Sequence, residues 1–189
     1  MQNECIYVIP DIHGAYGLLE LILKQILPLR KSDGRKDQLV FLGDYVDRSI
    51  ESHMVIERLA EVKAEFPNQT HFLMGNHEFM MLKAFDRCKQ SKTIGLDLEV
   101  NFRNWVHNGG YATIKGYLDR AELTDDDLHP TLMYDMPRFR VEQIIPKHHW
   151  EFFENLEPYY CYDKYLFVHA GVDPYDDIAK HEIASLVWD

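Results

Sequence analysis

The chain has 189 residues, and 46% of them are hydrophobic, which suffices for one domain with a sizeable core. Its net charge of −11, from 31 acidic and 20 basic residues, argues against a nucleic-acid or membrane surface, which would need clustered Lys and Arg. The three cysteines form no CxxC pair and no apolar run approaches the ~20 residues that span a bilayer, so we exclude a disulfide framework and a transmembrane helix, and we expect a cytoplasmic protein.

The first part of the chain alternates short apolar runs with helical patterns. Residues 6–10, 38–42 and 70–74 are predicted to be buried strands. Apolar residues recur at helical spacing between them, namely Leu18, Ile22, Ile26 and Leu29 before the second strand and Val55, Leu59, Val62 and Phe66 before the third. We expect Pro28 and the segment 32–34 to end the first helix. The alternation predicts an α/β fold with a parallel sheet covered by helices.

Residues 79–157 change in character, and we interpret them as a mostly helical insertion that forms one wall of a cleft. Helical patterns at 99–107 and 111–119 are separated by Asn108-Gly109-Gly110, which is a turn signal. The whole chain, residues 1–189, is expected to form a single domain.

The second half of the chain carries further helix and strand signals. Thr124 followed by three aspartates, 125–127, resembles a helix start, and Pro146 is expected to open another helix. Residues 158–169 return to strand character around a turn at Asp163-Lys164.

Four short motifs each follow an apolar run, in the order Asp11-Ile12-His13-Gly14, Gly43-Asp44-Tyr45-Val46-Asp47-Arg48, Gly75-Asn76-His77-Glu78 and Val168-His169-Ala170-Gly171. Ligands of parallel sheets bind at the carboxyl ends of the strands, where the first three motifs fall. Turn formation alone explains the Gly, Asn and Asp residues. It does not explain why every turn also carries a metal ligand or an arginine. The set therefore predicts two metal ions beside a phosphate, as in a phosphate-ester hydrolase.

The predicted metal ligands offer oxygen and nitrogen. Asp11 and His13 are two residues apart, so an extended segment points both side chains to the same side. Asp44 is placed to bridge two ions, since a carboxylate has two oxygens. Asn76 adds a carbonyl oxygen, and His169 adds a second imidazole. This mixture suits Mn, Fe or Zn ions better than a thiolate site would.

Three further residues are expected to act on the substrate. Arg48 would clamp the phosphate oxygens through its guanidinium group. His77 is a candidate general acid for the leaving oxygen, and Asp47 would orient it and raise its pKa.

At these motifs the chain resembles the phosphoprotein phosphatase family of calcineurin-like metallophosphoesterases, which contains serine/threonine phosphatases of eukaryotes, bacteria and phages. The match spans residues 6–175 and looks most like the bacterial members. The resemblance implies a four-layer αββα sandwich and two divalent ions, of Mn or Fe type with Zn as an alternative. It implies a first ion on Asp11, His13 and Asp44, a second on Asp44, Asn76 and His169, phosphate binding by Arg48 and Asn76, and protonation of the leaving group by the His77–Asp47 pair.

The chain departs from the family pattern at three places. Pro10 stands where the family usually has Gly, and Ser49-Ile50 follow Arg48 in place of Gly-Pro or a similar pair. The family also continues beyond the residue that matches Trp188, commonly with a phosphate-binding Arg and a later metal-binding His. If the sequence is complete, we expect the C-terminal strands of the sandwich to be absent, which puts activity in doubt and leaves a sheet edge for self-association.

We therefore expect a serine/threonine protein phosphatase that hydrolyses phosphoproteins or phosphopeptides with a metal-bound hydroxide and without a covalent phosphoenzyme. The residues from Tyr45 to Arg48 favour this reading over a symmetrical dinucleoside tetraphosphate hydrolase, which uses the same metals. The third alternative is an inactive or truncated scaffold domain that binds metal without catalysis.

Overall fold

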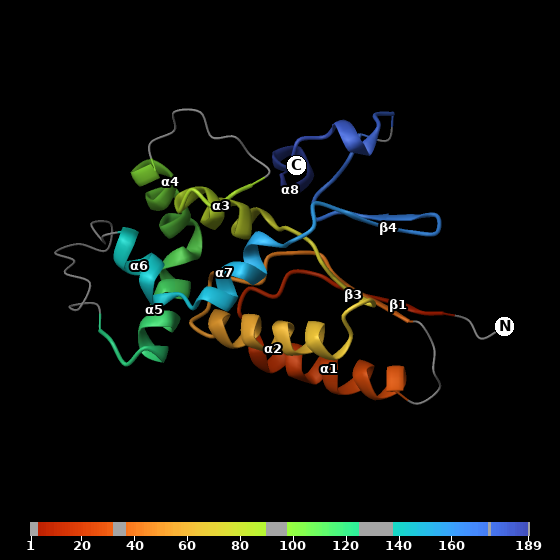
Figure 1. Ribbon diagram of the computed structural model, residues 1–189, viewed down its shortest axis with the longest axis horizontal. Helices are drawn as coiled ribbons and strands as arrows, with labels where there is room; N and C mark the ends of the chain where they lie inside the picture. The colour runs from red at the N-terminus through yellow and green to blue at the C-terminus, as the bar shows by residue number, and fades with distance from the viewer. Residues whose placement is uncertain (1–3, 32–36, 90–97, 125–137, 174, 189) are drawn as a thin grey trace.

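The computed structural model describes residues 4–31, 37–89, 98–124, 138–173 and 175–188 (Figure 1). The predicted helix start at 125–127 and the predicted helix end at 32–34 lie outside these ranges.

The central sheet has three parallel strands in the order β1 (Ile6–Ile9), β2 (Gln38–Phe41) and β3 (Thr70–Phe72), as predicted. Val8 pairs with Val40 in one ladder, and Phe41 pairs with Phe72 in the other. Strand β2 is buried along its whole length, because it has a neighbour on each side and is covered by helices. The α/β class expected from the sequence is confirmed.

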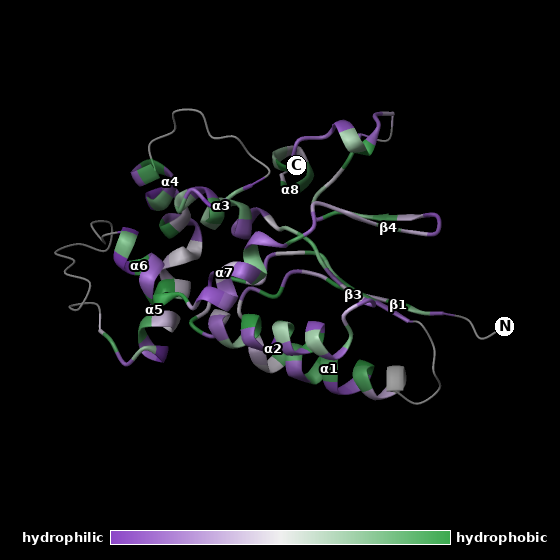
Figure 2. Ribbon diagram, in the orientation of Figure 1, coloured by the Kyte–Doolittle hydropathy of each residue, from purple (hydrophilic) through white to green (hydrophobic). Residues whose placement is uncertain are grey.

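Two helices, α1 (Tyr16–Lys31) and α2 (Ser52–Glu65), pack together on one side of this sheet (Figure 1). Both mix hydrophobic and hydrophilic residues along their length, as amphipathic helices do (Figure 2). Helix α2 buries Val55, Leu59 and Val62 on the predicted face. The two helices thus cover this face of the sheet. They leave its carboxyl edge free for the loops that follow the strands.

Helix α1 runs through Pro28 to Lys31, directly before the segment 32–34 that was predicted to end it together with Pro28, so Pro28 alone does not end it. Near the end of a helix, the missing N–H and the ring of a proline affect only the contact with the preceding turn. Among the α1 side chains that the structure describes, Leu19, Leu23 and Leu27 are buried; of the residues predicted by spacing, Ile22 and Ile26 are partly buried against the core, and Leu18 is 59% exposed. Two apolar stripes overlap on this helix, and the spacing alone does not tell which one faces the sheet.

The insertion is helical in the parts that the structure describes. Its elements are α3 (Asn76–Ala84), α4 (Leu98–Trp105), a kinked turn with π-helical character (Val106–Gly110), α5 (Tyr111–Arg120), α6 (Arg138–Ile144) and α7 (Lys147–Glu154). Aromatic rings form its core, with Phe85 packed edge-on against Phe102, Trp105 and Trp150. The predicted turn at Asn108-Gly109-Gly110 lies between α4 and α5, where Gly109 leaves the helical conformation with φ of +112°. The insertion therefore packs as a helical body beside the sheet (Figure 1).

The chain after the insertion returns to strand structure. Leu73, just past β3, bridges to Glu157, and an antiparallel hairpin of β4 (Tyr160–Tyr162) and β5 (Tyr165–Phe167) follows. The hairpin lies on the side of the parallel sheet away from α1 and α2 (Figure 1). A 3-10 helix (Ile178–Lys180) and the short helix α8 (Ile183–Val187) come last.

Candidate active site

The loops that follow β1, β2 and β3 meet at the carboxyl edge of the parallel sheet. The amides of Ile12 and His13 donate to the carbonyl oxygen of Asp44 at 3.0 and 2.8 Å, which ties the first loop to the second. Gly75 in the third loop approaches so closely that a Cβ there would lie 2.2 Å from Asp44 Oδ1. Only glycine fits such a close approach. The three motifs thus pack as one unit around Asp44.

Four residues of these loops have a left-handed backbone, which residues other than glycine rarely adopt. The φ angle is +45° at His13, +53° at Asp44, +71° at Asp47 and +66° at Arg48. Each such residue costs on the order of 1–3 kcal/mol and persists only where the surrounding structure holds it. Asp86, Glu122 and Asp163 show the same conformation singly, at helix ends and in the hairpin turn, whereas these loops hold four such residues together, and strain of this kind concentrates at functional sites.

The five side chains predicted as metal ligands gather around the carboxylate of Asp44. His13 Nε2 lies 3.5 Å from Asp44 Oδ2 and 4.0 Å from Asp11 Oδ2. His169 Nε2 lies 3.6 Å from Asp44 Oδ1 and 3.0 Å from Asn76 Oδ1. The two imidazoles therefore approach different oxygens of one carboxylate, which is the arrangement that a bridging ligand of two ions requires.

The hydrogen bonds of the two histidines fit metal binding. Nδ1 of His13 contacts the carbonyl oxygen of Val46 at 2.9 Å, and Nδ1 of His169 contacts that of Leu42 at 2.9 Å. A carbonyl oxygen only accepts, so each neutral ring carries its proton on Nδ1 and keeps a lone pair on Nε2. Nε2 of His13 is buried and has no hydrogen-bond partner among the residues that the structure describes. A divalent cation would satisfy this atom, and the residues present fit a pair of such ions.

The side-chain amide of Asn76 can face Asp44 and His169 in two orientations. With the nitrogen turned inward, it would donate to His169 Nε2 at 3.0 Å and to the two oxygens of Asp44 at 3.1 and 3.0 Å. With the oxygen turned inward, it meets the same three lone-pair atoms, and a cation stabilises that arrangement. The carbonyl oxygen is thus available as a ligand.

His77 and Asp47 form a buried pair next to these ligands. Nδ1 of His77 lies 2.7 Å from Asp47 Oδ2, and its Nε2 lies 3.2 Å from Nη2 of Arg48. The ring also packs edge-on against His13, with 4.7 Å between the ring centroids. Both ring nitrogens already have protein partners, and one partner is a cation. This favours a role for His77 toward the substrate over a role as a metal ligand, although a ring nitrogen of His77 lies within 4.8 Å of the ligand atoms of His13 and Asp44.

Burial and charge act in opposite directions on this pair. Burial lowers the pKa of His77, but the hydrogen bond and the negative charge of Asp47 outweigh it and leave that pKa raised. Burial also raises the pKa of Asp47, against the hydrogen bonds from His77, Thr113 and Trp105, which lower it. The raised pKa favours the protonated form that a proton donor needs. The guanidinium of Arg48 can only donate, so its contact with Nε2 belongs to the neutral ring, and Nε2 can carry a proton only when Arg48 turns to another partner.

The family model for calcineurin-like phosphoesterases matches residues 6–185. The chain belongs to this family. A metallophosphoesterase needs two metal ions held by carboxylate, imidazole and amide ligands. The side chains of these types that gather around Asp44 agree with membership of the family.

Curated relatives of this phosphoesterase carry two kinds of name. The chain is 36% identical over 74 residues to serine/threonine-protein phosphatase BSL2 of Arabidopsis thaliana, covering 39% of the chain and 7% of the relative. It is 40% identical over 83 residues to serine/threonine-protein phosphatase 2 of Escherichia coli (strain K12), covering 43% and 33%. It is 31% identical over 87 residues to the symmetrical bis(5'-nucleosyl)-tetraphosphatase of Buchnera aphidicola subsp. Schizaphis graminum, covering 46% and 29%. The matched part spans a third or less of each relative.

The sequence analysis assigned no role to Glu78, which lies in the third motif of the phosphoesterase. Its buried carboxylate accepts four backbone N–H groups, from Asp44 at 2.8 Å and Gly75 at 3.2 Å on Oε2, and from Tyr45 at 2.8 Å and Val46 at 3.1 Å on Oε1. Glu78 therefore fixes the loop that carries Asp44. The signal was present in the sequence as the fourth residue of Gly75-Asn76-His77-Glu78.

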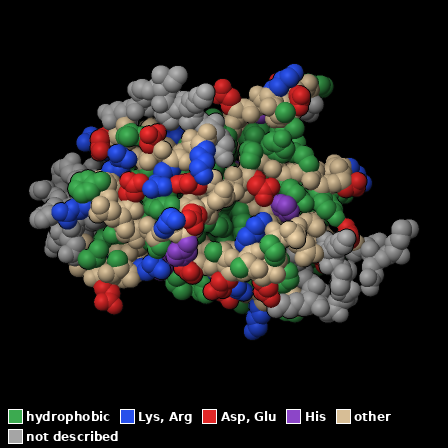
Figure 3. Space-filling view, in the orientation of Figure 1, with side chains coloured by type: hydrophobic (Ala, Val, Ile, Leu, Met, Phe, Trp, Pro, Cys, Tyr) green, Lys and Arg blue, Asp and Glu red, His purple; other side chains and the backbone are tan. Residues whose placement is uncertain are grey.

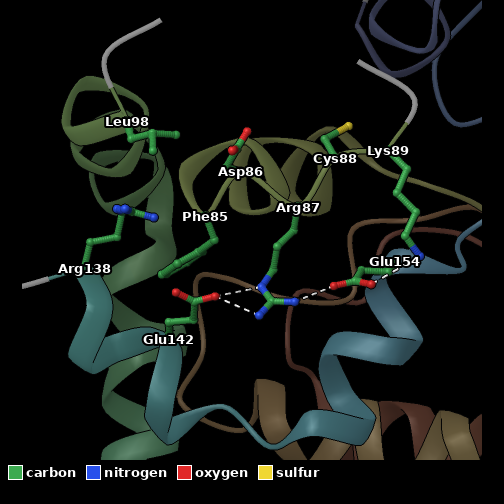
Figure 4. A pocket seen from close by; sticks show the side chains of 9 residues that line it. All are labelled: Phe85, Asp86, Arg87, Cys88, Lys89, Leu98, Arg138, Glu142 and Glu154. Atoms are coloured by element: carbon green, nitrogen blue, oxygen red, sulfur yellow. Dashed lines mark hydrogen bonds and ion pairs between the residues drawn. The ribbon is translucent and has the colours of Figure 1, made fainter. Parts of the chain in front are cut away.

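A separate hollow of about 540 Å³ lies between α3, α4, α6 and α7 (Figure 4). Arg87 points into it, but its guanidinium is neutralised by Glu142 at 2.7 Å and Glu154 at 2.5 Å. These two carboxylates neutralise Arg87, but Lys89 and Arg138 also line the hollow. The metal-ligand types predicted from the sequence gather around Asp44 and not in this hollow.

The face of the phosphoesterase seen in Figure 3 shows no large cluster of Lys and Arg side chains among the described residues, as expected from the acidic composition. Acidic and basic side chains are interspersed over the face seen in Figure 3, with an apolar group near the C-terminal segment and the hairpin. Among the residues that the structure describes, no helix has the length and apolar character needed to cross a membrane.

Proposed function

We propose that this chain hydrolyses phosphomonoesters and that its substrates are phosphoserine and phosphothreonine side chains of proteins. The observation that carries the proposal is the meeting of Arg48 and His77, 3.2 Å apart, directly beside the ligands around Asp44. An anion clamp and a proton donor at one point are what a phosphate ester with a poor leaving group requires.

Each residue has a defined task in this proposal. Two bound divalent ions would activate a water molecule and neutralise the phosphoryl oxygens. Arg48, together with Asn76, binds and orients the phosphate. Once Arg48 has turned from Nε2 to the phosphate, His77 can be protonated at Nε2 and give that proton to the leaving oxygen, while Asp47 holds Nδ1–H and so fixes the ring.

The substrate bond to be broken favours an acid in the site. The alkoxide of a serine or threonine is a poor leaving group and must be protonated as the P–O bond breaks. Two of the relatives reported above are named serine/threonine-protein phosphatases. The name of the Buchnera relative favours a second candidate, the symmetrical hydrolysis of dinucleoside tetraphosphates.

The test compares a phosphoserine peptide with diadenosine tetraphosphate, using the chain loaded with Mn²⁺. We expect a higher kcat/KM for the peptide. A strong preference for the dinucleotide would replace our proposal by the second candidate. Failure of the loaded protein to hydrolyse any phosphomonoester would favour a scaffold that binds metal without catalysis.

Substitution of His77 by Asn tests the acid directly. We expect kcat for the phosphopeptide to fall by roughly 10²-fold or more, within the range that general acid catalysis supplies, while bound metal per chain changes little. Metal analysis and steady-state kinetics on the same sample check this. Loss of both activity and metal would instead make His77 a ligand.

A further inference from the structure

The helical insertion reaches into the site through two side chains that hold Asp47. The indole Nε1–H of Trp105 donates to Asp47 Oδ2 at 3.0 Å and Oδ1 at 3.2 Å. The hydroxyl of Thr113 donates to Asp47 Oδ1 at 2.7 Å and accepts the backbone N–H of Asp47 at 2.8 Å. With His77 on Oδ2, both oxygens of this buried carboxylate are hydrogen-bonded.

The turn between these two residues holds the backbone of the same loop. The N–H of Arg48 donates to the carbonyl oxygen of Gly109 at 3.2 Å. A Cβ on Gly109 would lie 3.2 Å from both Cγ and N of Arg48, and its φ of +112° disfavours any other residue. The strained pair Asp47 and Arg48, with φ of +71° and +66°, is therefore held by α4, the π-helical turn and α5 together.

We propose that Trp105 and Thr113 are positioning residues for the proton transfer by His77. The helical insertion then contributes directly to the geometry of the active site. They fix the plane of the Asp47 carboxylate, so that Oδ2 stays opposite Nδ1 of His77. The ring then keeps Nε2 directed toward Arg48 and the leaving oxygen. This inference rests on the proposed function, because it needs His77 as the acid.

Trp105 and Thr113 differ in how much else they do. Trp105 is fully buried among Phe85 and Phe102, so its substitution also affects the core. Thr113 is buried as well, but only its hydroxyl reaches Asp47, and valine has nearly the same shape. Thr113→Val therefore keeps the shape while removing the two hydrogen bonds with Asp47 and a longer one, 3.3 Å, to Ser52 Oγ, and it gives the cleaner test.

The readout is the dependence of kcat on the leaving group. Phenyl phosphate needs a proton on its leaving oxygen, whereas 2,4-dinitrophenyl phosphate has a leaving group that departs without one. We expect Thr113→Val and Trp105→Phe to lower kcat for phenyl phosphate about tenfold, which is part of the ~10²–10⁴ that a general acid contributes. The same variants should change kcat for the dinitrophenyl ester less than about threefold, with KM and metal content preserved.

Two controls frame this experiment. Thr113→Ser restores the hydroxyl and should recover the rate with phenyl phosphate. Thr70→Val makes the same change at a buried threonine on β3 whose hydroxyl has no hydrogen-bond partner in the described part of the chain, and it should leave both rates unchanged. Thermal unfolding of every variant identifies any that has lost its fold. If Thr113→Val does not fold, Trp105→Phe still removes a hydrogen bond to Asp47, and Thr113→Ser still tests whether a hydroxyl at position 113 suffices for the rate with phenyl phosphate.

The outcomes separate this inference from the proposed function. If His77→Asn shows the leaving-group dependence but Thr113→Val and Trp105→Phe lower both rates equally, or neither, the positioning role is refuted and the proposed function stands. If His77→Asn itself shows no such dependence, the acid assignment fails, and the inference falls with it.

Discussion

At the scale of single residues, Asp44 is the point around which the site is assembled. Its carbonyl oxygen accepts the amides of the first loop, and its own amide donates to Glu78 at 2.8 Å. Its carboxylate accepts the backbone N–H of His77 at 3.0 Å and faces His13 and His169. One residue with a strained backbone thus connects the three motifs.

Glu78 gives a prediction at this scale. Burial and the charge of Asp44 raise the pKa of Glu78 to about 8, but two backbone N–H groups donate to each of its oxygens, which requires the ionised carboxylate. Glu78→Gln would turn an amide nitrogen toward two of these N–H groups and lose their hydrogen bonds. We expect the free energy of unfolding of the metal-free protein to fall by about 2–4 kcal/mol. Urea unfolding measures this change. Glu61→Gln, at an exposed carboxylate paired with Arg58, should cost less than ~1 kcal/mol, and equal losses in the two variants would disprove the role of Glu78.

At the scale of elements, α7 is joined to α2 and α5 through His149. Its side chain is fully buried, with Nδ1 at 2.7 Å from the hydroxyl of Tyr117 and Nε2 at 3.0 Å from Glu57 Oε2. Burial lowers the pKa of His149 to about 4. The helix contact therefore depends on a neutral imidazole.

This contact predicts a loss of stability in mild acid. The unfolded histidine has a pKa of ~6.5, so the unfolded state binds more protons than the folded state between about pH 6.5 and 4. Stability contributed by His149 is complete above that window and falls by up to about 3 kcal/mol as the pH drops through it. Urea unfolding at pH 7 and pH 5 should show a flatter pH dependence for His149→Gln. His148→Gln, at the half-exposed neighbour, should keep the steep dependence, and identical behaviour of the two variants would refute the argument.

The elements also show what a sequence can predict. The strands, the edge of the sheet and the gathering of Asp11, His13, Asp44, Asn76 and His169 follow from local patterns, because each motif directly follows its strand. The contacts of Trp105 and Thr113 with Asp47 do not, since they join residues 58 and 66 positions apart. The Asn108-Gly109-Gly110 segment predicted the turn between the two helices but not these contacts. The buried face of α1 was predicted in part, through Ile22 and Ile26, because packing and not spacing decides which of two overlapping apolar stripes is most deeply buried.

At the scale of the whole molecule, an apolar groove of about 360 Å³ lies between β1 and the hairpin, lined by Ile6, Val8, Tyr165 and Phe167 with Glu4. Among the described strands, β1 pairs only with β2, so its other edge is open. Val8 is 43% exposed and Tyr165 50% exposed. Open edges and apolar patches favour association, whereas the net charge of −11 opposes it.

We therefore predict weak self-association that increases with salt, because salt screens the repulsion between like-charged copies. Sedimentation velocity at low and high ionic strength measures it. Val8→Lys and Tyr165→Lys should reduce the association, whereas Leu18→Lys, at an exposed position on α1, should not. A strict monomer under all conditions would contradict this prediction.

The measurement that tests the central claim most directly is the number of Mn²⁺ ions bound per chain at equilibrium dialysis, for the native sequence and for Asp44→Asn. Asn tolerates the left-handed backbone of Asp44 but removes the bridging charge. The account predicts about two ions for the native chain and at most one, weakly held, for the variant. Equal binding by the two proteins, or none by the native chain, would contradict it.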